Sequence, residues 1–486
     1  MLFFAADMKK VEPVITEELL RQRMPFEPTT GQSRLFHVFA RFANSVRPRC
    51  ALLIRGYAGT GKTTCVQAMV SALESVGVHA VLLAPTGRAA KVMSAYCGRP
   101  ASTIHREIYQ RRTDRAGNVF FDLRENEREN TIFIVDEASM IGTEAFARVN
   151  DEVASGNVLE DLITHVYTGG NCKLVLIGDT AQLPPVGSAE SPALNLRNLV
   201  REYDLNAAEV ELTEVVRQAG DSGILDNATR IRNLIASGTA SLPQFTTVGP
   251  GDVIRIESDL ESSLEDALRN YGQEDVMIIT RSNKRANLFN QQFRARILGY
   301  EEEINSGDRM MVLRNNYYWL TENFPEKDGF IANGDVILIE RIIRFEDREG
   351  FRFCRARVSL IDFPDIPAFE TILLCNTIWS EGPSLDSQKG KELYQLISKD
   401  YEDQTPGRMR RSVQADPYYN ALQVKFAYAV TCHKAQGGQW ESVFVDQGYL
   451  TDEMAGVELN RWFYTAITRA SKKLYLVGFS RDLVEE

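Results

Sequence analysis

The sequence has no hydrophobic run long enough to cross a membrane. A membrane-spanning helix needs about 20 consecutive apolar residues, and no stretch of the 486-residue chain approaches that length. The chain starts MLFFAADMKK, and its apolar run ahead of the lysines is shorter than the apolar core of a signal peptide. We therefore expect a soluble, cytoplasmic protein without a membrane partner.

Cysteine is scarce, and no two cysteines form a C-x-x-C pair. The seven residues are widely scattered, and an odd number does not suit a disulfide framework. We expect reduced thiols, most of them packed inside a cytosolic protein. The cysteines are Cys50, Cys65, Cys97, Cys172, Cys354, Cys375 and Cys432.

An excess of positive charge is also missing. Lys and Arg total 55 against 66 Asp and Glu, so the net charge of −11 argues against nonspecific coating of nucleic acid or an anionic membrane. A local basic groove remains compatible with this balance. Hydrophobic residues make up 44% and charged residues 25%, which excludes a largely disordered chain. At roughly 150 residues per domain, the length predicts about three domains.

Short apolar strands alternate with helical segments from Cys50 to about Val200. Nearly continuous runs of Val, Ile and Leu are typical of strands buried on both faces of a parallel sheet. The pattern predicts an α/β fold with a helix at 62–76 and another at 88–97, which Gly98 and Pro100 end. The expected strands are ALLIRG (51–56), VHAVLLAPT (78–86), TIFIVDEA (131–138) and CKLVLIGDT (172–180).

A second α/β region opens near Val210 and resumes at the end of the chain. It contains a strand at 275–283, a helix at 284–298, and further strands and a helix between 424 and 479. The intervening stretch 335–420 is strand-like at first, then charged and irregular through DYEDQTPGRMRRS, and we interpret it as a small β insert. A shorter insert, 106–130, has strand-like arms around an Ala-Gly-Asn turn at 116–118.

The strongest motif is GYAGTGKT, which matches G-x-x-x-x-G-K-[ST] between an expected strand and an expected helix. This context is typical of a P-loop, whose backbone N–H groups surround phosphates at a helix N-terminus. Lys62 would reach the β and γ oxygens, and the Thr63 hydroxyl would bind Mg²⁺. A plain glycine-rich turn is the alternative. The predicted nucleotide contacts are Gly56, Ala58, Gly59, Thr60, Gly61, Lys62, Thr63 and Thr64.

Two further strands deliver polar side chains to the same sheet edge. Asp136 and Glu137 end one strand, where Asp136 would hold Mg²⁺ and Glu137 would orient and deprotonate a water. Asp179 and Gln182 follow the next strand, and Gln182 would sense the γ-phosphate or the attacking water. Without the P-loop, a solvated Asp-Glu pair would be the usual interpretation, and an ordinary polar loop around Gln182 would be as good as a functional one.

Nine blocks follow one another along the chain: TTGQSRLF, GYAGTGKTT, APTGRAAKVM, STIHREIY, IFIVDEASM, LIGDTAQLPPVG, LTEVVRQ, AYAVTCHKAQGGQW and FYTAITRAS. In this order they resemble the superfamily 1 helicases, specifically the RecD and Dda branch of the 1B group. DEAS, QLPPV and HKAQG decide the branch, since the related 1A helicases usually carry other residues there. Gln439 departs from the pattern, because relatives often have Glu at that place.

The resemblance implies two RecA-like P-loop NTPase domains with parallel sheets, each carrying an insert. The implied divisions are an N-terminal segment (1–24), a first domain (25–105 and 131–209) with a hairpin insert (106–130), and a second domain (210–334 and 421–486) with an SH3-like β insert (335–420).

The resemblance also assigns residues around the nucleotide. Gln32 would read the adenine, Gly437 would contact the nucleotide, and Arg217 and Arg469 would meet the γ-phosphate from the second domain. An always-charged planar guanidinium suits phosphate oxygens. A solvated or ion-paired arginine is the ordinary alternative.

Residues implied to hold single-stranded DNA come from loops on both domains. Hydroxyls and a few cations suit a phosphate track that does not read base sequence, although both histidines also suit a purely structural role. These residues are Thr86, Arg88, Thr103, His105, Thr431, His433 and Lys434.

The two inserts offer further DNA contacts. Phe120 and Phe121 in the hairpin insert are candidates for a pin that separates strands by stacking on the last base pair, or they form the buried face of the hairpin. The arginines at 408, 410 and 411 are candidates for DNA contact, or they belong to a solvated basic loop.

The function implied is a monomeric, ATP- and Mg²⁺-dependent DNA helicase of 5′ to 3′ polarity, in a branch associated with DNA repair and recombination. Its partners would be single-stranded DNA and single-strand/duplex junctions, and no protein partner can be named from the sequence. Two alternatives stay open: an RNA-directed or protein-stripping translocase, and a regulatory ATPase subunit of a nuclease complex.

Overall fold

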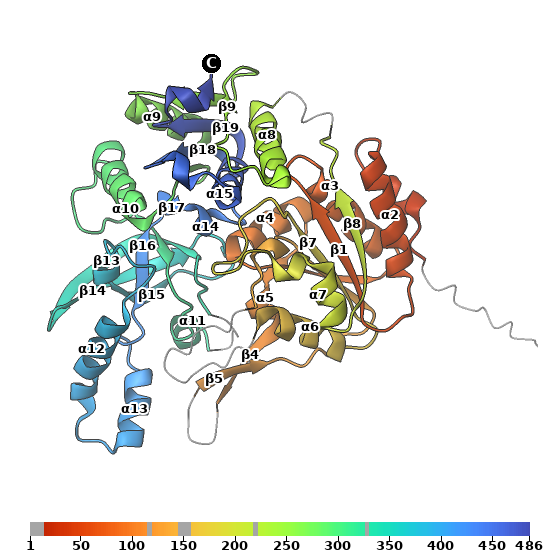
Figure 1. Ribbon diagram of the computed structural model, residues 1–486. Helices are drawn as coiled ribbons and strands as arrows, with labels where there is room; N and C mark the ends of the chain where they lie inside the picture. The colour runs from red at the N-terminus through yellow and green to blue at the C-terminus, as the bar shows by residue number, and fades with distance from the viewer. Residues whose placement is uncertain (1–13, 114–118, 144–156, 217–221, 326–329) are drawn as a thin grey trace, which may run out of the picture.

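The protein is organised around two parallel sheets and a β-barrel (Figure 1). The computed structural model describes residues 14–113, 119–143, 157–216, 222–325 and 330–486. Each sheet lies in its own lobe, and the second lobe combines segments that are far apart in the sequence. In the described residues, no helix is both long and apolar enough to cross a membrane.

The first sheet has six strands in the order β3-β2-β6-β7-β1-β8, and all neighbouring strands run parallel. Every residue of β6 and β7 is buried, as expected for continuous apolar runs at the centre of a parallel sheet. The four predicted strands are confirmed. The bounds are β1 Cys50–Gly56, β2 His79–Ala84, β3 Ala101–Thr103, β6 Thr131–Val135, β7 Lys173–Gly178 and β8 Asn206–Leu212.

Helices cover both faces of this sheet and form two separate cores. One core receives side chains from α1 (Glu17–Arg21), α2 (Thr30–Ala43), α3 (Lys62–Ser75) and α4 (Gly87–Cys97). The other receives them from α5 (Ile104–Ile108), α6 (Val158–Thr168) and α7 (Leu196–Arg201). The predicted end of α4 is confirmed, since Gly98 caps it in the left-handed region with φ 64°.

The second sheet has five parallel strands in the order β10-β19-β18-β11-β17. The predicted helix at 284–298 is present as α10 (Asn283–Gln292), continued by one π-helical turn at Phe293–Ile297. The strands are β10 Val253–Ile256, β11 Val276–Thr280, β17 Ala429–Thr431, β18 Trp440–Asp446 and β19 Ala470–Val477, and the helices are α8 Gly223–Ser237, α9 Leu260–Tyr271, α14 Cys432–Ala435 and α15 Val457–Ile467. A short parallel pair, β9 (Phe245–Thr246) and β20 (Val484–Glu485), lies beside them.

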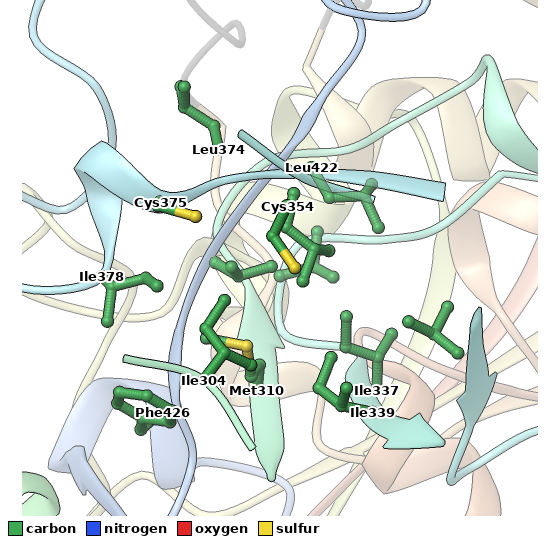
Figure 2. Close-up of a cluster of buried hydrophobic side chains, with 14 of the residues drawn as sticks. Ile304, Met310, Ile337, Ile339, Cys354, Leu374, Cys375, Ile378, Leu422 and Phe426 are labelled. Atoms are coloured by element: carbon green, nitrogen blue, oxygen red, sulfur yellow. The ribbon is translucent and has the colours of Figure 1, made fainter. Parts of the chain in front are cut away.

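A closed five-stranded barrel joins the second lobe. Its first and last strands lie outside the stretch 335–420, so the insert completes the barrel instead of forming it alone. Figure 2 shows part of its core, where Met310, Ile337, Cys354 and Phe426 come together. The strands are β12 Arg309–Val312, β13 Val336–Arg348, β14 Phe351–Leu360, β15 Phe369–Leu374 and β16 Leu422–Phe426.

The second half of the insert is helical, so its interpretation as irregular is wrong, although its sequence is charged. Two helices, α12 (Ser387–Ser398) and α13 (Pro406–Gln414), extend from the barrel, with the short α11 (Trp319–Asn323) nearby (Figure 1). Val413 of α13 is buried and Met409 packs against the same core. One apolar contact per turn supports the helix, and its Arg-rich face hides that spacing in the sequence.

The shorter insert forms an antiparallel hairpin of β4 (Tyr109–Thr113) and β5 (Val119–Leu123). Backbone pairing places Phe120 opposite Arg112 and Phe121 opposite Arg111. The predicted turn at 116–118 and the side chains of both phenylalanines lie outside the described residues. The hairpin arms are therefore confirmed, whereas the strand-separating pin stays a prediction.

One buried amide connects α10 to the strands that lead to the TCHK segment. The Oδ1 atom of Asn290 accepts hydrogen bonds from the N–H groups of Tyr428 and Ala429, and its Nδ2 donates to the carbonyls of Phe426 and Ala429. Asn290 is 2% exposed. The predicted α/β class with parallel sheets is confirmed. The Asn290 amide links the second lobe to the end of the barrel strand β16.

We expect Asn290→Ala to lower the free energy of unfolding by about 2–4 kcal/mol, because buried backbone groups would lose their partners. Urea denaturation followed by circular dichroism measures the change. Asn287→Ala is the matched control: Asn287 donates to two carbonyls at the partly exposed edge of α10, and its loss should cost less than about 1 kcal/mol. Equal destabilisation by both variants would contradict the role of Asn290.

Candidate functional site

The loop between β1 and α3 forms a cradle of backbone N–H groups. Gly59 and Gly61 have φ 75° and 77°, in the left-handed region that glycine tolerates. A Cβ on Gly61 would lie 2.5 Å from the Nε2 atom of Gln32, and any side chain would be strained at its φ of 77°. The Thr60 hydroxyl donates to the Tyr57 carbonyl at 2.8 Å and closes the turn. The loop therefore has the shape that a P-loop requires.

Lys62 begins α3 with its ammonium group inside this loop. Its Nζ donates to the carbonyls of Gly56 at 2.5 Å and Tyr57 at 3.0 Å. The same atom lies 4.0 Å from the Oδ2 of Asp179. Thr63, the next residue, is exposed at the first turn of α3, while Thr64 is half-buried. The lysine is thus placed between the phosphate cradle and the carboxylate that follows β7.

Gln32 lies against the cradle but is already engaged. Its Oε1 accepts from the Thr29 N–H at 3.1 Å in a capping box that begins α2, and its Nε2 donates to the Thr60 carbonyl at 3.1 Å. The side chain is completely buried. Its observed contacts position the loop, and the reading of an adenine stays a prediction.

Asp136 and Glu137 follow β6 at the same sheet edge. The Tyr96 hydroxyl donates to Asp136 at 2.7 Å, and the Glu137 N–H donates to its other oxygen at 2.8 Å. Burial raises the pKa of Asp136, the charge of Glu137 raises it further, and the Tyr96 hydroxyl opposes both effects. Glu137 has φ 51°, an uncommon backbone conformation for a residue with a side chain. No motif in the sequence pointed to Tyr96.

Asp179 and Gln182 are buried in the turn that follows β7. Asp179 is 1% exposed and accepts from the Ala181 N–H at 2.9 Å, and burial raises the pKa of its carboxyl group. Gln182 is 7% exposed, and its Oε1 has no hydrogen-bond partner among the described residues. An unpaired buried acceptor is costly unless it serves a ligand or water.

A cavity of about 430 Å³ lies beside this turn. Gln182, Asp179 and Ser139 line it from the first lobe, together with Arg461 from α15. The Ser139 hydroxyl is also without a partner in the described part of the chain. The polar edge of the first sheet therefore borders a cavity in which Gln182 and Ser139 have atoms that can still form hydrogen bonds with a ligand.

Arg469 reaches this edge from the second lobe. Its guanidinium donates to the carbonyls of Thr465 at 3.1 Å and Gly438 at 3.2 Å, and it lies 3.6 Å from a carboxylate oxygen of Glu137. The side chain is 6% exposed. Arg217 lies outside the described residues. Of the two predicted arginines, the one that the structure describes faces the acidic pair across the two lobes.

Gly437 of the second lobe lies against the start of α4 in the first lobe. A Cβ at this position would be 2.8 Å from the Cβ of Ala89 and 3.2 Å from the Oγ1 of Thr86, and the residue has φ 74°. These neighbours belong to the start of α4 and not to the phosphate cradle. Its observed role is close packing of backbone, while contact with a nucleotide stays a prediction.

Three predicted DNA contacts, Thr86, Arg88 and Lys434, line one cavity of about 70 Å³ between the lobes. Arg88 lies 3.5 Å from Asp362 and 5.4 Å from the Trp440 ring centre. Lys434 donates to the Asn333 side chain, and burial lowers its pKa to about 8. The two lobes and the barrel thus bring cations from distant blocks to one cavity.

The other predicted DNA contacts differ in exposure. Thr103 is buried and caps α5, where its hydroxyl accepts from the Arg106 N–H. The His105 ring lies 5.6 Å from the Tyr109 ring, and burial lowers its pKa to about 4, so it is neutral near pH 7. Thr431 is half-buried at the start of α14, and His433 is exposed.

The residues at the sheet edge fit a nucleotide and Mg²⁺. Among the described residues, no group of three or more His, Cys, Asp or Glu could hold a metal ion by itself. Magnesium usually takes only one or two protein oxygens and completes its shell with phosphates and water. The exposed Thr63 hydroxyl and the Asp136 carboxylate supply such oxygens beside the phosphate cradle.

Two protein families match the two lobes. Residues 36–241 match the AAA domain family, and residues 426–477 match the UvrD-like helicase C-terminal domain family. The first match covers the P-loop, the acidic pair and the turn with Gln182. The second covers the TCHK segment and α15, which precedes Arg469.

Two curated relatives are helicases. The ATP-dependent RecD2 DNA helicase of Deinococcus radiodurans is 33% identical over 180 residues, covering 36% of this chain and 21% of the relative. The ATP-dependent DNA helicase dda of Enterobacteria phage T4 is 30% identical over 208 residues, covering 42% of each. The chain spans less than half the length of either relative.

A solved structure of Pif1 helicase from Bacteroides, in complex with ADP-AlF3 and ssDNA, is 15% identical, with a TM-score of 0.45 over 95% of both chains. The two matched domain families and the two helicase relatives agree with the resemblance of the nine ordered blocks to the superfamily 1B helicases of the RecD and Dda branch.

Proposed function

We propose that this chain is an ATP-dependent DNA helicase that moves 5′ to 3′ on single-stranded DNA and opens duplexes at single-strand/duplex junctions. The observation that carries the proposal is the approach of Arg469, from the second lobe, to within 3.6 Å of Glu137 beside the P-loop. A site completed by both lobes links nucleotide turnover to their relative motion. The protein acts as a monomer in this proposal.

Each residue at the edge has a defined task. The cradle N–H groups and Lys62 bind phosphate oxygens, while Thr63 and Asp136 hold the cation. Glu137 orients a water and accepts its proton, with Gln182 fixing the water or the phosphate. Mg²⁺-ATP supplies the phosphoanhydride bond whose hydrolysis drives the cycle. Arg469 and Arg217 stabilise the negative charge that develops on the transferred group.

Gln32 and Gly437 supply the remaining proposed contacts around the nucleotide. Gln32 meets the adenine after nucleotide binding turns its buried amide toward the base, and Gly437 lets the second lobe approach. We also propose the division into two RecA-like domains at the boundaries expected from the sequence. The hairpin is the insert of the first domain, and the insert of the second domain contributes the barrel strands β13, β14 and β15.

Single-stranded DNA lies along the side of the molecule where the cavity of about 70 Å³ opens between the lobes. Thr86 and Arg88 from the first lobe and Thr431, His433 and Lys434 from the second meet the backbone, and Thr103 and His105 shape the wall. Closure and opening of the lobes shift these groups relative to one another and so move the strand. Phe120 and Phe121 of the hairpin separate the strands.

Lys62→Ala should lower DNA-stimulated ATP hydrolysis by about 10²-fold or more, because the phosphates lose a charged donor. Duplex unwinding should vanish with it. ATPase and strand-displacement assays with Mg²⁺ measure both. The control is Lys472→Ala, which removes an exposed lysine paired with Glu441 and should leave both rates unchanged. Unwinding by the Lys62 variant would refute the mechanism.

The same assay with two partial duplexes tests polarity. We expect opening only of the duplex with a 5′ single-stranded tail. Opening only from a 3′ tail would contradict the proposed direction, and ATP hydrolysis without opening would favour a translocase or a partner-dependent subunit. Stronger stimulation of hydrolysis by RNA than by DNA would identify an RNA-directed enzyme.

Affinity for single-stranded DNA should fall about tenfold from about pH 7 to about pH 9, because Lys434 loses its charge as pH rises through its lowered pKa of about 8. Fluorescence anisotropy with a labelled oligonucleotide measures the change. Lys434→Arg should remove the decline, since arginine stays charged. Lys472→Arg, at an exposed position, should keep it. A decline that persists in Lys434→Arg would exclude Lys434 as a DNA contact.

A further inference from the structure

One helix of the second lobe touches the nucleotide edge of the first lobe at several points. The Thr465 hydroxyl of α15 accepts from the Leu183 N–H at 2.8 Å, and Gln436 donates to the Leu183 carbonyl at 2.7 Å. Arg469 follows the C-terminal end of the same helix. The turn that carries Gln182 is thus held at its far end by the second lobe.

The residue before Thr465 makes the closest connection to the P-loop. The Tyr464 hydroxyl accepts a hydrogen bond from the Ala58 N–H at 2.8 Å and donates one to the Oδ2 of Asp179 at 2.7 Å. Tyr464 is 1% exposed. One hydroxyl group of the second lobe therefore joins the phosphate loop to the carboxylate that begins the Gln182 turn.

Three groups surround this carboxylate. Lys62 lies 4.0 Å from the Oδ2 of Asp179, the Tyr464 hydroxyl bonds to the same oxygen, and the charge of Glu137 acts on it unfavourably. Burial raises the pKa of Asp179, whereas Lys62 and Tyr464 favour its charged form. Separation of the lobes would remove the hydroxyl from the half-buried Ala58 N–H and the Asp179 carboxylate, and water would have to replace it at both groups.

We propose that Tyr464 is a positioning residue that holds the P-loop and the Asp179–Leu183 turn in their working arrangement only while the second lobe is docked. It acts through Ala58 and Asp179 and does not touch the reacting atoms. This inference rests on the proposed ATPase function. It makes docking of the second lobe a condition for ATP hydrolysis, and the contact responsible is the one made by Tyr464, not one made by the arginines of the second lobe.

The test is Tyr464→Phe, which keeps the ring and removes the hydroxyl. We expect the kcat of DNA-stimulated ATP hydrolysis to fall about tenfold, while the KM for ATP and the melting temperature stay close to those of the wild type. Tyr401→Phe is the matched control, because its hydroxyl bonds to Asp416 at 2.9 Å beside the barrel, away from the lobes' contact. It should leave kcat unchanged.

A double-mutant cycle with Asp179→Asn tests the coupling. If Tyr464 acts through Asp179, the double variant should be no slower than the slower single variant, within about twofold. Losses that multiply, or an unchanged kcat in Tyr464→Phe, would overturn the inference. A loss of melting temperature without a fall in kcat would also overturn it, because Tyr464 would then be merely structural.

The same measurements separate this inference from the proposed function. A wild-type chain that hydrolyses ATP while Tyr464→Phe matches it refutes only the role of Tyr464. A wild-type chain that does not hydrolyse ATP, with or without DNA, refutes the proposed function and removes the basis of the inference with it.

Discussion

Strands β1, β6 and β7 lie within one parallel sheet, with β7 between the other two, and their carboxyl ends meet at one edge. The P-loop, the acidic pair and the Gln182 turn each follow one of these strands. Reversing any one strand would move its polar residues to the opposite edge. The site therefore depends on strand direction, which in turn depends on helices returning the chain across the faces of the sheet.

Polar groups are buried at this edge at some energetic cost. Burial raises the pKa of both Asp136 and Asp179, and each carboxylate receives a tyrosine hydroxyl in compensation, from Tyr96 and Tyr464 respectively. Gln182 keeps an unpaired buried oxygen. Such costs are common where a site is organised in advance for a ligand, because the groups then need little rearrangement when it binds.

The second lobe and the barrel complete surfaces that the first lobe cannot form alone. The guanidinium of Arg106 stacks 3.8 Å from the ring centre of Phe363, which follows the barrel strand β14. It lies 3.9 Å from Asp335, whose pKa burial raises to about 7. These polar contacts join the lobes beside an apolar cluster that Ala181 and Leu183 of the first lobe share with the second lobe.

Local sequence determined the elements whose signals lie within a few residues. Continuous apolar runs predicted the central strands, and glycine spacing together with Lys62 and Thr63 predicted the loop that begins α3. Gly98 predicted where α4 ends. These predictions succeeded because strand burial, helix capping and left-handed turns are properties of short segments. The order of the nine blocks resembles that of known helicases, and this resemblance predicted the two domains and the roles of individual residues.

Tertiary structure alone decided which distant residues meet. No spacing relates Tyr96 to Asp136 or Tyr464 to Ala58, and α13 was hidden by its charged face. The barrel takes β12 and β16 from outside the insert, because closing a sheet requires partners for both edge strands. Hydrogen bonds between separate lobes form only after each lobe has folded. The sequence by itself therefore determined the chemistry at each strand end, while packing between the lobes decided which side chains complete it.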